Sequence, residues 1–250
     1  MSKTRTKTVG LARALSKMGV CSRAQAAQLI RAGEVRVNGG VRRDPETPIR
    51  LGKDRVEVDG QAIAARETIY LALNKPRGIV TTASDEKGRE TVYSLLDAKL
   101  PWVAPVGRLD KASEGLLLLT NDSKWGARIT APEMHLDKTY HVQIGRIADE
   151  ALLEALKNGV RTKEGVTLRV KAASLLRQGE RNSWVEIILD EGKNRHIRRM
   201  LETLEIEVLR LIRVAIGPLA LGELAKGAVR PLTADEKLTL GRALKQNTKI

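Results

Sequence analysis

Cysteine is almost absent from this sequence, and histidine is scarce. The 250 residues include one cysteine, Cys21, so an intramolecular disulfide is excluded. Three histidines, His135, His141 and His196, are too few to complete a zinc site without carboxylate ligands. We therefore expect no disulfide and no metal site in the fold.

Aromatic residues and long apolar runs are also missing. The chain has three Trp, three Tyr and no Phe, whereas domains that read single-stranded RNA by stacking need several rings on one surface. No apolar stretch approaches the ~20 residues of a membrane span. The basic segment MSKTRTKTVG has no apolar run behind it, so it is not a secretory signal. We expect a cytoplasmic protein whose nucleic-acid contacts, if it makes any, go to phosphates and shape.

Positive charge is in excess and unevenly distributed. Forty-four Lys and Arg against thirty Asp and Glu give a formal net charge of +14. Residues 1–60 hold thirteen Lys and Arg and six Asp and Glu, a net charge of +7, so a quarter of the chain carries half the excess. This balance points to a polyanionic partner, with nucleic acid favoured over an anionic membrane.

The first sixty residues have the pattern of a small α/β module. Apolar residues at helical spacing predict a helix over 9–20, and Ser22 followed by Gln25 is a capping-box start for a second helix that ends near Gly33. Asn38–Gly39 between alternating residues predicts a hairpin, and residues 54–60 alternate in the same way. We predict two short helices followed by a small sheet.

This module resembles an S4 RNA-binding domain. The likeness lies in L-A-R-A-L-x-x-x-G-x-x-S-R-x-x-A-x-x-L-I-x-x-G-x-V-x-V-N-G over residues 11–39. A solvated helix face is the alternative explanation of its basic residues. The resemblance favours RNA binding through four residues, which we call the S4 cations: Arg13, Lys17, Arg23 and Arg31.

The remainder of the chain reads as a second domain over 69–250, after a short linker at 61–68. Interleaved strands and helices indicate an α+β domain built around a mixed sheet. The predicted strands are 69–74, 115–120, 138–144, 166–173, 183–189 and 208–216. The predicted helices are 123–130, 148–159, 194–204 and one that starts at Thr233, with Glu236 completing a capping box.

Asp110 is the first candidate for chemistry. It stands in VGRLDKASEGLLLLTND (106–122), directly before a run of leucines that predicts a buried strand. A carboxylate close to the core needs a charged or hydrogen-bonding partner, either in a structural ion pair or in an active site. Three other stretches are unexpectedly polar: LNKPRG (73–78), KTYHV (138–142) and DEGKNRHIRRM (190–200).

Taken together, these stretches resemble the RsuA-type pseudouridine synthases. The shared motifs are N-K-P-x-G, G-R-L-D-x-x-S-x-G-L-L-L-L-T-N-D, K-x-Y and E-G-x-N-R-x-I-R-R-M, in this order. Ser113 stands where the family more often has Thr, and the hydroxyl is kept. The resemblance implies a mixed, mostly antiparallel sheet flanked by helices, and isomerisation of a uridine in ribosomal RNA without cofactor or metal.

The resemblance also implies residue roles. Asp110 would be the nucleophile, Arg198 its charge partner, and Tyr140 the ring that packs against the extruded base. Arg108 would fill the space that the base leaves, and Lys75 would stand with it at the active-site rim. The further RNA-binding residues would be Arg77, Lys193, Arg195 and Arg199.

Two other functions fit parts of the sequence. A non-catalytic S4 protein that binds ribosomal RNA during ribosome assembly would share the basic module, but it would not need Asp110, Tyr140 and Arg198 together. A membrane-surface protein would need a lysine-rich amphipathic helix with bulky apolar anchors, which the sequence lacks. We expect a monomeric pseudouridine synthase that acts on large- or small-subunit ribosomal RNA.

Overall fold

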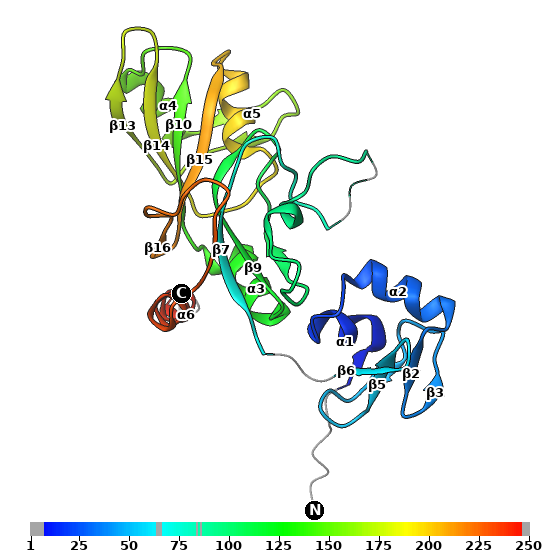
Figure 1. Ribbon diagram of the computed structural model, residues 1–250. Coiled ribbons are helices and arrows are strands. Elements are labelled where there is room, and N and C mark those ends of the chain that lie inside the picture. The colour runs from blue at the N-terminus through cyan, green and yellow to red at the C-terminus, as the bar shows by residue number, and fades with distance from the viewer. Residues whose placement is uncertain (1–7, 64–66, 84, 86, 247–250) are drawn as a thin grey trace, which may run out of the picture. The chain divides into compact units, whose positions relative to one another are not determined.

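Figure 1 gives the computed structural model of the protein, which describes residues 8–63, 67–83, 85 and 87–246. The chain folds as two compact units. The first comprises residues up to Tyr70 together with Asp97–Ala104 and Leu119–Ser123, and the second comprises Leu71–Leu96, Pro105–Leu118 and the chain from Lys124 onward. Two short segments of the predicted catalytic domain thus pack with the N-terminal unit.

The first unit has the two predicted helices and the small sheet, but the first helix is shorter than predicted, because Val9–Gly10 form a strand that pairs with Pro48–Ile49. Ser22 and Gln25 form the expected capping box at the start of α2, and Gly33 ends that helix in the left-handed conformation. Asn38 and Gly39 both have positive φ, as the hairpin requires. The elements are β1 (Val9–Gly10), α1 (Leu11–Lys17), α2 (Arg23–Ala32), β2 (Val35–Val37), β3 (Gly40–Val41), β4 (Pro48–Ile49), β5 (Val56–Val58) and β6 (Gln61–Ile63).

Strand β6 lies in the segment predicted to be a linker. It pairs antiparallel with β5 and is the edge of a four-stranded sheet in the order β3-β2-β5-β6. The turn between the two strands is Asp59–Gly60, and both residues have positive φ. An Asp-Gly pair after alternating residues is a hairpin signal, so three residues of the expected linker belong to the sheet. Residues 64–66 lie outside the described part of the chain.

The second unit is built on a nine-stranded sheet with the main order β13-β14-β10-β15-β9-β7-β17. Neighbours from β13 to β15 pair antiparallel, as do β17 and β7, whereas β15 and β9 run parallel. The sheet is therefore mixed and mostly antiparallel, as expected. Its strands are β7 (Tyr70–Lys75), β8 (Ala104–Val106), β9 (Glu114–Thr120), β10 (Lys138–Ile144), β13 (Ala172–Gln178), β14 (Ser183–Leu189), β15 (Val208–Ile216), β16 (Leu219–Ala220) and β17 (Val229–Pro231).

Helices α4 and α5 share a core with one face of this sheet. Inward residues of β10, β14 and β15 cluster with Leu152, Leu156, Ile197 and Met200 of the two helices. The burial of β14 alternates along its whole length, which is the pattern of a strand with one face in the core. The helical elements are η1 (Val92–Leu95), α3 (Ser123–Thr130), η2 (Pro132–Met134), α4 (Glu150–Asn158), α5 (His196–Thr203) and α6 (Ala234–Gln246).

The predicted strand over 166–173 is not continuous. Its first part is β12 (Thr167–Leu168), which forms a small hairpin with β11 (Val160–Arg161). The chain then leaves this hairpin and enters the edge strand β13 at Ala172. The alternation of buried Leu168 and Val170 comes from packing in the α4 and α5 core rather than from one strand.

No helix in the described ranges is long and apolar enough to cross a membrane.

Candidate active site

Asp110 lies on a turn that leads directly into β9. The turn is closed by a hydrogen bond from the Ser113 N–H to the Asp110 carbonyl at 2.9 Å. Two residues later, Gly115 pairs with Arg213 where β9 and β15 run parallel. A Cβ on Gly115 would lie 2.3 Å from the Arg213 carbonyl oxygen, and its φ is +103°. Only glycine permits this close approach, which ties the Asp110 turn to the centre of the sheet.

All five carbonyl groups from Leu109 to Ser113 accept hydrogen bonds. Thr81 Oγ1 donates to the Leu109 carbonyl at 2.8 Å, and the Gly78 N–H donates to the Lys111 carbonyl at 2.8 Å. The other three carbonyls are held by the Ser113 N–H and by two long cationic side chains. A turn held at every carbonyl is rigid, so its one carboxylate has a fixed position.

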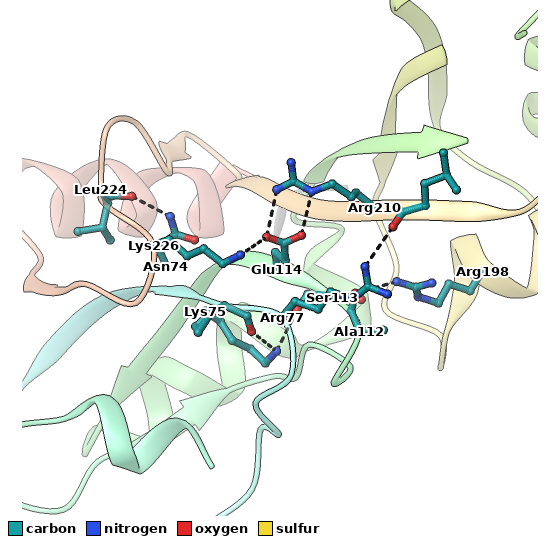
Figure 2. Close-up of polar contacts among 12 residues, drawn as sticks. Asn74, Lys75, Arg77, Ala112, Ser113, Glu114, Arg198, Arg210, Leu224 and Lys226 are labelled. Carbon is teal, nitrogen blue, oxygen red and sulfur yellow. Dashed lines mark hydrogen bonds and ion pairs between the residues drawn. The ribbon is translucent and has the colours of Figure 1, made fainter. Parts of the chain in front are cut away.

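Lys75 holds the turn from inside the protein. Its side chain has no exposed surface, and Nζ donates to the carbonyls of Pro76, Asp110 and Ser113 at 3.0, 3.2 and 2.9 Å. Figure 2 shows the contact between Lys75 and Ser113. Burial lowers the pKa of Lys75 to about 8, against the opposing charge of Asp110. Its predicted place at the active-site rim is therefore wrong. The three ammonium N–H groups match three carbonyls in a buried, structural position.

Arg198 contacts the same turn but does not form the predicted ion pair. Its Nη2 donates to the Ala112 carbonyl at 3.0 Å (Figure 2). Burial, followed by repulsion from Arg195, lowers the pKa of Arg198, and the charge of Asp110 opposes this shift. The ion pair of Asp110 is instead with Arg195, whose Nη1 lies 3.8 Å from Oδ2. Arg195, predicted as an RNA-binding residue, is thus the nearest cation to the carboxylate.

The position of Arg195 follows from how α5 begins. Arg195 is the N-cap of the helix and adopts the left-handed conformation, with φ 47° and ψ 33°. This conformation costs free energy for a residue with a side chain, and such strain is concentrated at functional sites. Helical spacing from residue 194 would place Arg195 in one stripe with Arg198, whereas the observed start at His196 separates them.

Glu114, which sequence reasoning missed, is held by two cations directly after the turn. It is buried at the start of β9 and pairs with Arg210 and Lys226, both at 3.1 Å (Figure 2). Burial alone would raise the pKa of Glu114, but the hydrogen bonds from the two cations outweigh it and lower the pKa. The side chain of Asp110 is the only carboxylate of this segment that stays open, with 35% of its surface exposed.

A cavity of about 260 Å³ opens beside Asp110. Tyr140 of β10 and Arg213 of β15 stand opposite each other in the strand register and both line it. The cavity thus brings together Asp110, Tyr140 and Arg198, which the sequence predicted as the catalytic set. Its charged wall residues are the cations Arg108, Lys138, Lys193, Arg195, Arg198 and Arg213 and the carboxylates Asp110 and Glu191.

The remaining predicted residues divide between the cavity and other surfaces. Arg108 and Lys193 line the cavity and are exposed. Arg199 does not line it and pairs with Glu164 at 3.0 Å. Arg77 does not line it either, and its Nη1 lies 3.5 Å from the Leu209 carbonyl. Of the S4 cations, the three arginines are exposed and Lys17 is half-buried.

Two cavity residues escaped the sequence reasoning. Arg213 is 5% exposed, and Lys138 has its pKa lowered by burial and then by the charge of Arg213. The signal for Arg213 was its spacing from Arg210 in VLRLIRVAI (208–216). Residues three apart on a strand point to opposite faces of the sheet. One of the two arginines in that strand therefore had to point inward. Within the described residues, no group of three or more His, Cys, Asp and Glu could hold a metal ion.

Comparisons with known proteins agree over both units. Residues 69–203 match the family described as RNA pseudouridylate synthase, and residues 9–56 match the S4 domain. The ribosomal large subunit pseudouridine synthase B of Bacillus subtilis is 37% identical over 240 residues, which cover 96% of this chain and 98% of that protein. An uncharacterized RNA pseudouridine synthase of Aquifex aeolicus is 36% identical, covering 92% of each chain. A crystal structure of a pseudouridylate synthase superimposes with a TM-score of 0.65 at 30% identity, covering 93% of this chain and 99% of the other.

Proposed function

Because the chain belongs to the RNA pseudouridylate synthase family, we propose that it converts one specific uridine of ribosomal RNA to pseudouridine, with Asp110 as the nucleophile. Ribosomal RNA is the substrate class in the name of the Bacillus subtilis relative, which matches nearly the whole of both chains. On the same ground we propose large-subunit RNA as the target. The six cations in the cavity wall fit a polyanion that enters beside Asp110.

One observation supports the role of Asp110 most strongly. Five consecutive carbonyls are hydrogen bonded around it, and yet its own carboxylate remains a third exposed beside a cavity. Arg195 places a positive charge 3.8 Å from the Asp110 carboxylate, and carboxylates serve as nucleophiles in covalent catalysis. A purely structural Asp would point its oxygens at the bonds that fix the turn.

The proposed reaction is redox-neutral and needs no added water. A carboxylate oxygen of Asp110 attacks C1′ of the target uridine, and the N1–C1′ bond breaks with its electron pair remaining on the base. The base then turns, C5 bonds to C1′, and the bond from C1′ to Asp110 breaks to regenerate the carboxylate. Loss of the C5 proton and protonation of N1 complete the isomerisation without a cofactor.

The target base must leave the RNA stack before Asp110 can reach C1′. Tyr140 stands in the cavity wall, where its ring can pack against the extruded base. Arg108 is exposed at the cavity and lies two residues before Asp110, so it is placed to occupy the gap left in the RNA. The S4 cations supply further phosphate contacts outside the catalytic unit.

The test uses a strain that lacks this gene, complemented with wild-type protein or with Asp110→Asn. Pseudouridines in ribosomal RNA are mapped by carbodiimide-dependent stops of reverse transcription. We expect the deletion strain to lose the reverse-transcription stop at one uridine, and the wild-type protein to restore it. Asp110→Asn should not restore the stop, because the amide has the shape of the carboxylate but is not a nucleophile. Tritium release from 5-labelled uridine RNA then measures turnover. Activity of Asp110→Asn within tenfold of wild type would remove Asp110 from this role.

A further inference from the structure

Arg213 is a buried cation without a matching partner. It is 5% exposed, and its Nε donates to the Leu116 carbonyl at 2.7 Å. Its Nη2 is fully buried and has no hydrogen-bond partner, and no carboxylate of the described residues lies within ion-pair distance of its guanidinium. An arginine stays charged when buried, and an unsatisfied buried donor of a charged group costs more than a neutral one. Such a donor in a cavity wall is expected to meet a ligand.

The register fixes where this donor stands. Arg213 is directly opposite Tyr140 in the antiparallel pair of β10 and β15, so the two side chains are neighbours on one face of the sheet. On its other side Arg213 is the parallel partner of Gly115, which follows the Asp110 turn. The nucleophile, the tyrosine and the guanidinium therefore share one hydrogen-bonded frame and line one cavity.

The cations of this cavity lie at different depths, and Lys138 and Arg198 are half-buried. Arg108, Lys193 and Arg195 are exposed, so they can meet the phosphates of an RNA strand that stays outside. Arg213 is buried, and a phosphate group at the cavity mouth does not reach a side chain in the interior. The part of the substrate that enters the cavity is the extruded base. Its edge offers two carbonyl oxygens, O2 and O4, as acceptors.

We propose that Arg213 is a catalytic residue that donates from its unpaired guanidinium edge to a carbonyl oxygen of the target uracil. The proposal rests on the proposed function. Once the N1–C1′ bond breaks, the detached base carries the electron pair as an anion, whose charge is shared by the two carbonyl oxygens. A fixed cationic donor stabilises that charge more than it stabilises the neutral base, so it accelerates the reaction. It also holds the base in the cavity while it turns.

The experiment combines a substitution in the protein with a single-atom change in the RNA. Short synthetic RNAs carry uridine, 2-thiouridine or 4-thiouridine at the target position, because sulfur is a weak acceptor in place of oxygen. Single-turnover rates are measured by chromatography of the digested nucleosides. Wild type, Arg213→Gln and Arg213→Lys are compared, with Arg108→Gln as the matched control from the exposed rim.

We expect Arg213→Gln to slow the oxygen substrate about 100-fold or more, as loss of a transition-state donor does. One of the two sulfur substitutions should slow wild type by about tenfold or more, and this sulfur effect should shrink to less than about threefold in Arg213→Gln. Arg108→Gln should weaken RNA binding and keep the full sulfur effect. If Arg213→Gln does not fold, the same sulfur effects are measured on Arg213→Lys. The lysine ammonium can still donate to the Leu116 carbonyl, but it lacks the Nη2 donor proposed to reach the base.

Two results overturn the assignment. Sulfur effects of equal size in wild type and in the folded Arg213 variant, at both O2 and O4, would mean that the guanidinium does not contact the base. Equal turnover of the variant and wild type on the oxygen substrate would mean the same. Absence of wild-type turnover on every ribosomal RNA tested would overturn the proposed function, and this assignment with it.

Discussion

Replacing Lys75 with methionine removes a buried ammonium but keeps a side chain of similar length. Three carbonyls lose a donor, those of Pro76, Asp110 and Ser113. The Asp110 carbonyl keeps the Ser113 N–H as a donor, so within the described residues the Pro76 and Ser113 carbonyls are the two left without one. The substitution therefore tests whether the position of Asp110, the proposed nucleophile, depends on a buried side chain behind it.

The expected loss of stability follows from two opposing contributions. Each buried carbonyl without a donor costs about 1–3 kcal/mol. Removing the buried charge recovers part of this, because desolvation of an ammonium is unfavourable. A net loss of about 2 kcal/mol in the free energy of unfolding results, which lowers Tm by about 4–8 °C for a unit of this size.

Activity should fall more than stability accounts for. With the turn released, Asp110 no longer has one fixed position, and a displacement of the nucleophile by about 1 Å costs on the order of 100-fold in rate. Single-turnover rates at a temperature where the variant is fully folded measure this loss, and filter binding on the same RNA should give a Kd within about threefold of wild type. Lys111→Met is the stability control, because Lys111 is adjacent to Asp110 but exposed.

The pH dependence gives an independent check. Folding lowers the pKa of Lys75 from 10.5 to about 8, so between these values the native state binds fewer protons than the unfolded chain. The free energy of unfolding of wild type should then rise with pH across this window, relative to Lys75→Met, which lacks this titrating ammonium. A Lys75→Met protein with wild-type Tm, wild-type turnover and the same pH profile would refute the role of Lys75.

The remaining predictions concern the cations around the turn and the S4 cations. Arg198→Met should lower the free energy of unfolding by about 1–2 kcal/mol through its bond to Ala112, equally in wild type and in Asp110→Ala; a coupling above about 1 kcal/mol in urea unfolding would contradict this. Arg195 and Asp110 are both partly exposed, so their double-mutant cycle should give at most about 1 kcal/mol. Changing all S4 cations to Gln should flatten the log–log salt dependence of RNA binding by about two to four units, and an unchanged slope would place the main RNA contacts on the catalytic unit.

Much of the fold could be predicted from strong local sequence patterns. The apolar run of β9, the alternation of β10 and β14 and the capping box before α6 are set by neighbouring residues, and these elements formed where they were predicted. Strand β6 was not predicted, although Asp59–Gly60 is a hairpin signal. The small residues after this turn have little intrinsic preference for a strand. Pairing with β5 makes it a strand.

The candidate site was predictable in its members more than in their contacts. Asp110, Tyr140 and Arg198 do line one cavity, but the ion pair of Asp110 depends on where α5 begins. The helix starts at His196, two residues later than predicted, and the carboxylate pairs with Arg195 rather than with Arg198. Lys75 follows a strand and precedes Pro76, which is typical of an exposed turn. Lys75 becomes buried only when β7 and β9 come together in one sheet, and the residues around Lys75 in the sequence do not predict that pairing.

The junction of β9 and β15 connects the Asp110 turn to the cavity wall through paired strands. These two strands run parallel, and Gly115 lies so close to the backbone of Arg213 that no side chain fits at position 115. The Asp110 turn leads into β9, and Arg213 of β15 stands opposite Tyr140 of β10. The proposed nucleophile and the residues proposed to bind the base are thus held by paired strands and one glycine rather than by loops. In a reaction that detaches a base, turns it and rejoins it, such a frame keeps C1′ and the base within reach of each other, which is the contribution that positioning makes to the rate.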